Sequence, residues 1–298
     1  MPSLKGLRIR KASVISTKKI TSAMKMIAAA KMRKAQDQVE QSKVYADHMS
    51  DMITSLVEKS HTFESPPKLL VGTGRRDRQL VIMMTSDRGL CGGFNSNLTR
   101  SVIKRLNEFK VRDYSYDVIC VGRRGRDILR ASPHRDAIIE TFSAFDKPKF
   151  WQAVRIAGLV IDRFEKGEFD VCTMVYNRFV SVISQKITEH QLVPYSPLQT
   201  EDVKLELVGS KGLQAIYEYD PSEQSVLTQL LPQNLSVQIY RALLENAASE
   251  HGARMTAMDS ATRNADDMIE HLGLLYNRTR QAIVTKELIE IISGAGVL

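Results

Sequence analysis

The sequence predicts an α/β protein in which a Rossmann-like α/β domain is inserted between two long terminal helices that pair as an antiparallel coiled coil. Three observations predict this fold. The nine prolines lie at Pro2 or between Pro66 and Pro232, both proline-free ends carry heptad patterns, and the middle alternates strand-like with helix-like segments. Because proline disrupts helix interiors, each end is free to form one uninterrupted helix.

The N-terminal segment, residues 1–65, is predicted to be the first long helix. In its second half, apolar or small residues recur in alternating steps of four and three, the pattern of a coiled-coil seam. They are Ala28, Met32, Ala35, Val39, Ser42, Ala46, Met49, Ile53 and Leu56. Upstream, the same heptad places Lys11, Lys18 and Lys25 on the seam. We therefore expect a poorer register there and a different neighbour for that part.

The C-terminal segment, residues 232–298, is predicted to be the second long helix, beginning near Pro232. Its seam residues are Met255, Met258, Thr262, Ala265, Ile269, Leu272, Tyr276, Thr279 and Ile283. Because the middle of the chain returns between the two seams, antiparallel pairing within one chain is favoured over a parallel homodimer, the alternative. About 55 helical residues span roughly 80 Å, whereas a globule of this length has a radius of gyration of ~19 Å. We expect the pair to project as a shaft.

The central α/β domain is expected at residues 75–200. Strands are predicted at residues 80–85, 118–121, 137–142, 169–176 and 179–188, and helices at 97–109, 124–129 and 151–164. This alternation is typical of a mostly parallel sheet with helices on its faces. Residues 201–231 are expected to form a foot or connector, with a candidate edge strand at 213–219.

Charge is unevenly distributed: residues 1–36 hold ten Lys or Arg and no acid, within a chain of net charge +8. Such a segment is compatible with nucleic acid, an anionic membrane, an organelle-targeting peptide or an acidic protein partner. It has no aromatic residue, which weakens base stacking and membrane anchoring alike. The helical pattern continues past Asp37, which argues against a detachable presequence. These features weaken the nucleic-acid, membrane and presequence interpretations, and they leave open an acidic protein partner or a charged helix face that is simply exposed to solvent.

Composition excludes other classes. No run of eighteen apolar residues occurs, so we expect no direct membrane insertion. The three cysteines, Cys91, Cys120 and Cys172, have no metal-ligand spacing and indicate a reducing compartment. The histidines form no HExxH motif, and no nucleophile–base set is indicated by spacing. We therefore expect no catalytic residue, no metal site and no cofactor.

The glycine-rich segment at residues 85–95, Thr-Ser-Asp-Arg-Gly-Leu-Cys-Gly-Gly-Phe-Asn, lies between a predicted strand and a predicted helix. Phosphate-binding loops occupy this place in nucleotide-dependent enzymes. However, the Walker lysine and the GxGxxG order are missing, and Asp87 would repel a phosphate group. A tight strand-to-helix turn that needs glycine backbone angles is favoured over a nucleotide site.

The C-terminal end is unusually apolar. Its apolar residues are Ile283, Leu288, Ile289, Ile291, Ile292, Val297 and Leu298. A helix end this apolar should not be left in water. Either it folds onto the rest of the chain, or another protein surrounds it.

Five blocks of sequence together carry a resemblance that runs from the first helix to the last residues. They are Lys-Ile-Thr-Ser-Ala-Met-Lys-Met-Ile-Ala-Ala-Ala-Lys at 19–31, Ser-Asp-Arg-Gly-Leu-Cys-Gly-Gly at 86–93, Arg-Met-Thr-Ala-Met-Asp-Ser-Ala-Thr-Arg-Asn-Ala at 254–265, Tyr-Asn-Arg-Thr-Arg-Gln-Ala at 276–282, and Thr-Lys-Glu-Leu-Ile-Glu-Ile-Ile-Ser-Gly-Ala at 285–295. In this order they resemble the gamma-subunit family of F-type ATP synthases, in its bacterial form. The cysteine-bearing insertion of photosynthetic relatives is not visible here, so thiol control is not expected.

The resemblance implies a central-stalk rotor that is not itself catalytic. Its shaft is expected inside a hexamer of alpha and beta subunits, and its foot against an epsilon-type subunit and the c-subunit ring. Rotation would couple transmembrane ion flow to ATP synthesis or hydrolysis at the beta subunits. The implied location is peripheral, on the cytoplasmic side of the bacterial inner membrane or, alternatively, on the matrix side of the mitochondrial inner membrane.

The resemblance also implies contact residues. Those expected to face the hexamer are Met24, Lys25, Arg254, Gln281, Thr285, Glu287, Ile291 and Leu298. Met24 and Lys25 match positions near an acidic loop of beta, which would account for the acid-free segment. Tyr217 and Glu218 match the foot, near the c ring and the epsilon-type subunit.

Overall fold

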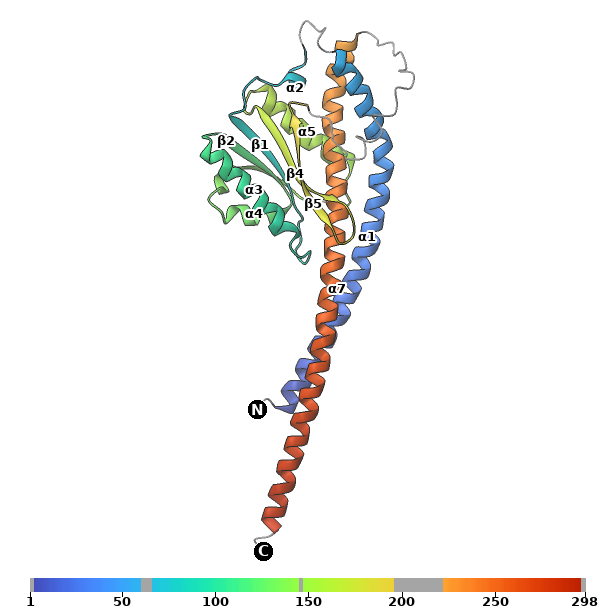
Figure 1. The fold of residues 1–298 in the computed structure, drawn as a ribbon, viewed down its shortest axis with the longest axis vertical. Helices are drawn as coiled ribbons and strands as arrows, with labels where there is room; N and C mark the ends of the chain where they lie inside the picture. The colour runs from blue at the N-terminus through green and yellow to red at the C-terminus, as the bar shows by residue number, and fades with distance from the viewer. Residues whose placement is uncertain (1–2, 60–65, 145–146, 196–221, 296–298) are drawn as a thin grey trace. The chain divides into compact units, whose positions relative to one another are not determined.

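A computed structural model describes residues 3–59, 66–144, 147–195 and 222–295 of the chain. The chain separates into two compact units: unit 1 comprises residues 1–30 and 254–298, and unit 2 comprises residues 31–253. Two long helices contribute to both units, α1 (Leu4–Lys59) and α7 (Glu223–Ala295) (Figure 1). The other described helices and strands all belong to unit 2.

Unit 2 contains a five-stranded sheet of order β3-β2-β1-β4-β5. The strands are β1 (Arg78–Met84), β2 (Ser115–Val121), β3 (Ile138–Phe142), β4 (Val171–Phe179) and β5 (Gln185–Val193). The β1–β2, β1–β4 and β2–β3 pairs are parallel, and the β4–β5 pair is antiparallel. The chain adds β2 and β3 on one side of β1 and then adds β4 and β5 on the other side. This change of side between β1 and β4 is typical of Rossmann-like sheets and confirms that prediction.

The helices of the sheet domain fall where the sequence predicts them. They are α3 (Phe94–Val111), α4 (Arg123–Arg130) and α5 (Phe150–Glu165), with the short α2 (Lys68–Val71) and a 3-10 turn, η2 (Arg135–Ala137), beside them. The last strand was predicted wrongly at 179–188. The Val180 and Ser181 N–H groups both donate to the Ser184 carbonyl, so residues 180–184 form the hairpin turn and β5 starts after it.

The core of the sheet domain has two sides, which β1 illustrates because its side chains alternate. Leu80, Ile82 and Met84 pack with residues of α5 and α7 on one face. Val81 and Met83 pack with residues of α3 and α4 on the other. The domain therefore consists of a sheet between two helical layers (Figure 1).

Helix α7 begins at Glu223, earlier than the predicted start near Pro232, and Pro232 lies inside it. A proline in a helix interior costs about 3 kcal/mol. Leu227 and Leu231, on the N-terminal side of the proline, are buried against α1, and each buried leucine contributes roughly 1.5–3 kcal/mol. Packing thus offsets the cost of continuing the helix through the proline. The candidate strand at 213–219 lies outside the described residues.

Within unit 2, α1 and α7 pair along the predicted seam. The α1 seam residues from Met32 to Leu56 are all buried or half-buried. Ala46, Met49, Ile53 and Leu56 pack against Leu227, Leu231 and Val237 of α7. Gly252 of α7 lies 3.6 Å, measured from the position of an added Cβ, from the Met32 sulfur. Early residues of one helix meet late residues of the other, so the predicted antiparallel pairing is confirmed.

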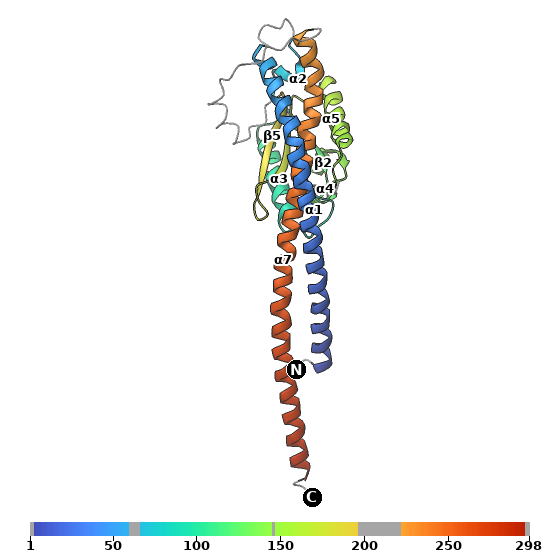
Figure 2. The same cartoon turned by 90° about the vertical axis from the view of Figure 1, so that its right-hand side faces the viewer.

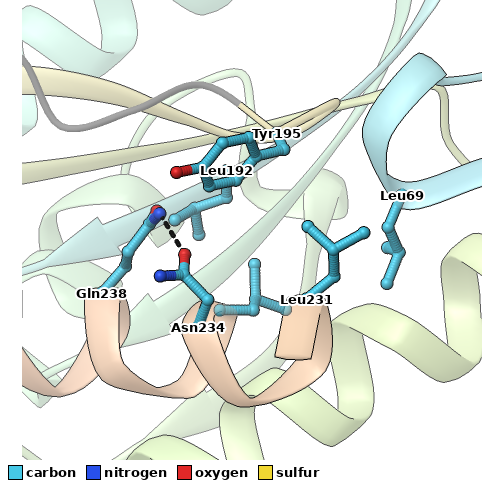
Figure 3. Close-up of a pocket in the computed structure, with 7 residues that line it drawn as sticks. Leu69, Leu192, Tyr195, Leu231, Asn234 and Gln238 are labelled. Atoms are coloured by element: carbon cyan, nitrogen blue, oxygen red, sulfur yellow. Dashed lines mark hydrogen bonds between the residues drawn. The ribbon is translucent and has the colours of Figure 1, made fainter. Parts of the chain in front are cut away.

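A chain of polar side chains joins α7 to β5. Gln238 donates to the Asn234 side-chain oxygen over 2.6 Å (Figure 3). Gln238 Oε1 lies 3.0 Å from His190 Nε2. Burial lowers the pKa of His190. The adjoining cavity of about 10 Å³ is lined by Leu69, Leu192, Tyr195, Leu231, Asn234, Leu235 and Gln238. A space of this size holds at most one water molecule, so this region belongs to the core.

Candidate partner-binding surface

Unit 1 is an antiparallel helix pair (Figure 2), and two ion pairs define its register. Lys18 Nζ lies 2.5 Å from Asp266 Oδ1, and Lys25 Nζ lies 2.5 Å from Asp259 Oδ1. An advance of seven residues in α1 corresponds to a retreat of seven residues in α7. The two helices therefore run in opposite directions at constant register.

A hydrogen bond between two hydroxyl groups lies between these ion pairs. The Thr262 hydroxyl donates to the Thr21 hydroxyl over 2.8 Å. We call Lys18, Thr21 and Lys25 of α1, with Asp259, Thr262 and Asp266 of α7, the polar ladder. Beyond it, Arg8 Nη2 donates to the Tyr276 hydroxyl over 3.1 Å, which lowers the pKa of Tyr276.

The polar ladder corrects one prediction. Lysines on the seam were expected to give a poorer register and a different neighbour for this part of α1. For Lys18 and Lys25 this was wrong, because both are half-buried and their ammonium groups reach aspartates beside the α7 seam. Lysine places its aliphatic stem along an apolar surface while its charged end stays accessible. Half-exposed pairs contribute little to stability, but they fix which residues face one another.

The residues expected to contact the hexamer occupy different parts of unit 1. Met24 and Arg254 are half-buried, and Lys25 is held by Asp259. Gln281, Thr285 and Glu287 are exposed on α7, and the Thr285 hydroxyl donates to the Gln281 carbonyl over 2.9 Å. The structure thus brings Gln281 and Thr285 onto one turn, more than twenty residues along α7 from the partner of Lys25. Leu298, Tyr217 and Glu218 lie outside the described residues.

The apolar end of α7 is exposed. Ile291 is 66% exposed and Ile292 is 71% exposed. Val284, Leu288 and Ile289 are also exposed. This end extends past the start of α1, as Figure 2 shows, because Arg8 already faces Tyr276 and α1 begins at Leu4. In unit 1, therefore, these side chains have no helix against which to pack.

A second set of exposed apolar residues was not anticipated from the sequence. Ile9, Ile20 and Ile27 of α1 are exposed, as are Met268 and Leu274 of α7. The steps of eleven and seven between the three isoleucines place them on one outward stripe of α1. Their signal in the sequence was that they are apolar yet lie off the seam. An apolar stripe of this kind is typical of a protein-binding surface.

The glycine-rich loop at residues 85–95 connects β1 to α3, and its polar atoms are used within unit 2. The Asp87 carboxylate accepts a hydrogen bond from the Arg123 N–H over 2.8 Å. The Thr85 hydroxyl accepts one from the Gly125 N–H over 3.0 Å. The loop is thus tied to the start of α4, and at the start of α3, where a phosphate group bound by this loop would lie, the Phe94 N–H donates to the Cys91 carbonyl over 3.3 Å. This geometry supports the prediction of a tight structural turn.

No group of three or more His, Cys, Asp or Glu side chains in the described ranges is arranged to hold a metal ion. None of the helices described is long and apolar enough to cross a membrane.

Comparison with known proteins assigns the family. A family model described as ATP synthase matches residues 3–298. The ATP synthase gamma chain of Rhodospirillum rubrum is 47% identical over 296 residues, which are 99% of each chain. That of Granulibacter bethesdensis is 48% identical over 299 residues, which are 100% of each chain. The chain belongs to the ATP synthase gamma-chain family.

Solved structures agree with this family. A chain of the Tetrahymena thermophila mitochondrial ATP synthase, from its central stalk and c-ring, is 28% identical with a TM-score of 0.59. The match covers 81% of this chain and 99% of that one. A rotor chain of the Euglena gracilis mitochondrial ATP synthase, 20% identical with a TM-score of 0.59, shares the fold. This gamma-chain family member thus has the fold of an ATP synthase central stalk.

Proposed function

We propose that this chain is the central-stalk rotor of an ATP synthase, which couples transmembrane ion flow to ATP synthesis or hydrolysis at catalytic beta subunits. The observation that carries the proposal is the match to gamma chains over the whole length. In this role the chain is not itself catalytic. It acts by changing the nucleotide affinity of the beta subunits as it turns.

Such a rotor must contact equivalent beta subunits unequally, because a shaft with the same contacts on every side shifts no equilibrium. The two helices of unit 1 differ in the required way. Residues 4–30 of α1 hold seven Lys or Arg and no acid, whereas residues 254–295 of α7 include six acids. An acidic loop of a partner would therefore be attracted more strongly to the α1 side of unit 1 than to the α7 side.

The exposed apolar end of α7 is suited to turn inside an apolar sleeve of another protein. Side chains such as Ile291 and Ile292 carry neither charge nor hydrogen-bonding groups. An apolar sleeve of the hexamer would exclude water from them without holding them at one angle. We include Leu298 in this contact. Met24, Lys25, Arg254, Gln281, Thr285 and Glu287 are proposed to be the polar contacts of the same surface.

The proposed partners are the hexamer of alpha and beta subunits, an epsilon-type subunit and the c-subunit ring. Tyr217 and Glu218 are assigned to the foot that meets the last two. The chain would be peripheral on the cytoplasmic side of a bacterial inner membrane or, alternatively, on the matrix side of the mitochondrial inner membrane. No nucleic acid takes part.

The test compares membranes that lack this chain with membranes in which it is restored. We expect ATP synthesis and ATP-driven ion pumping to be absent without the chain and to return with it. The purified chain alone should hydrolyse no ATP. Undiminished ATP synthesis without the chain, or ATP hydrolysis by the chain alone, would contradict the proposal.

A further inference from the structure

A third lysine, Lys11, occupies the heptad position of the two ladder lysines, one heptad earlier in α1. The ladder lysines pair with aspartates seven residues apart in α7, and the next position in that series is Gly273. Lys11 Nζ lies 3.3 Å from the place where a Cβ of residue 273 would be. Among the residues that the structure describes, no ion pair involves Lys11. Lys11 and Gly273 thus form a third position of the ladder, which we call a rung, and this rung has no carboxylate on α7.

The glycine at this rung leaves Lys11 without a side chain to contact at this position of α7. Glycine in a helix interior is unfavourable because it loses more backbone freedom than alanine on folding. Gly273 is nevertheless interior to α7, and the lysine ammonium lies where its side chain would have been. The neighbouring Arg8 already has a partner, since it donates to Tyr276. Among the described residues, the ammonium group of the half-buried Lys11 therefore has no carboxylate partner beside Gly273, and we call this position the notch.

We propose that the notch formed by Lys11 and Gly273 receives a carboxylate side chain from the protein that surrounds unit 1. This inference rests on the proposed function, which supplies the surrounding subunits. A carboxylate is the expected group because the two equivalent lysines each hold one at 2.5 Å. Ammonium and carboxylate groups form the short, charge-assisted hydrogen bonds that fix such a contact.

A protein carboxylate is favoured over a free anion because exposed apolar residues adjoin the notch in the chain. Leu274, the next residue of α7, is 66% exposed. Ile15, one turn after Lys11 in α1, is also exposed. A protein partner would bury these side chains along with the ion pair, whereas a small anion would leave them in water.

The experiment is zero-length carbodiimide cross-linking of the intact purified complex, followed by peptide mass spectrometry. Carbodiimide joins a lysine directly to a carboxylate that touches it. We expect internal links from Lys18 to Asp266 and from Lys25 to Asp259, which serve as built-in controls. Lys11 should instead link to an Asp or Glu of another subunit.

A variant makes the test specific. Gly273→Asp supplies the missing carboxylate within the chain, so the link from Lys11 should move to position 273 and its link to the other subunit should fall at least fivefold. Gly273→Asn, of the same shape but without charge, should form no internal link. Because only the flexible end of the lysine must give way, both variants are expected to assemble.

The proposal is overturned if the ladder links form in a complex that contains this chain while Lys11 links to no other subunit. Protection of Lys11 from acetylation by added inorganic phosphate, again without a protein link, would overturn it in favour of a free anion. Failure of the chain to be present in the complex is a different result, and it would count against the proposed function instead.

Discussion

Lys25 Nζ lies 2.5 Å from Asp259 Oδ1, and Arg263 donates a second hydrogen bond to the same carboxylate. The hydrogen bond from Lys25 is the largest of the effects that lower the pKa of Asp259, and the one from Arg263 is the next. The rung is therefore a carboxylate held in its charged form. Its contribution to the stability of unit 1 depends on pH in a defined direction.

Replacing this carboxylate should abolish that pH dependence. Because the folded pKa of Asp259 is below its unfolded value, the stabilisation is present above roughly pH 4 and is lost as pH falls through the folded pKa. The Asp259→Asn variant should have a lower Tm than wild type at pH 7, and the difference should shrink as pH falls. Asp267→Asn, at an exposed neighbouring position, is the control. A Tm difference that stays constant with pH would count against this account.

The turn after β2 requires glycine. Gly122 has φ +104°, and a Cβ there would lie 2.5 Å from the Thr85 carbonyl oxygen. We expect Gly122→Ala to lower the free energy of unfolding by about 3 kcal/mol or more, since backbone strain and a clash combine. Gly158→Ala is the matched control: nothing lies within 4 Å of its Cβ position in α5, so a gain of about 0.5–1 kcal/mol is expected. Urea unfolding measures both, and equal stabilities would refute the argument.

The Asp170 carboxylate ties the start of β1 to the start of β4. Its side chain is fully buried, and it accepts hydrogen bonds from the Arg78 guanidinium and from the Thr73 hydroxyl at 2.7 Å. The hydrogen bond from Arg78 is the main cause of the lowered pKa of Asp170. Because the charged form is favoured, its stabilisation is present above roughly pH 4 and is lost as pH falls through the folded pKa.

Asp170→Asn should therefore destabilise the protein by about 3 kcal/mol at pH 7, because it leaves the arginine without its buried partner. Asp162→Asn, on the exposed side of α5, should change stability by less than about 0.5 kcal/mol. The measurement is chemical unfolding at pH 7 and at low pH. The loss should diminish in acid; a loss that persists there unchanged would mean that packing, not charge, is responsible.

Met24 tests the proposed contact of the rotor. It is half-buried and precedes Lys25 in α1, so Met24→Lys adds a second ammonium group next to Lys25 in the chain. The extra charge would attract an acidic partner loop in some rotary positions more than in others. We expect ATP-driven pumping to fall several-fold relative to ATP hydrolysis. Met24→Leu, of similar volume, is the control and should leave this ratio unchanged. An unchanged ratio in Met24→Lys would mean that Met24 does not lie at the contact.

Sequence periodicity was sufficient for most of the fold. The seam from Ala28 to Leu56 was predicted residue by residue because burial selects one helical face. The alternation in unit 2 likewise predicted the parallel sheet. Pro232 misled the prediction of the α7 start, because the burial of Leu227 and Leu231 against α1 is not visible locally. The hairpin turn at 180–184 was missed because its valines and isoleucine have strand propensity.

The ladder was beyond the reach of periodicity for a different reason. Asp259 and Asp266 each follow a seam residue by one position, so a seam pattern passes over them. Their partners are hundreds of residues away in the chain, and only the register between α1 and α7 brings them together. Exposed residues such as Ile9 and Ile20 present a related difficulty, since their partner is another protein. For these residues, the sequence shows that an apolar side chain lies off the seam, but it does not show which protein would contact it.

Native mass spectrometry of the purified ATP synthase complex tests the central claim most directly. The account predicts one copy of this chain for every three beta subunits. It also predicts that removing the chain uncouples ATP hydrolysis from ion pumping. Recovery of the chain as a free monomer or homodimer, beside a fully coupled complex that lacks it, would contradict the account.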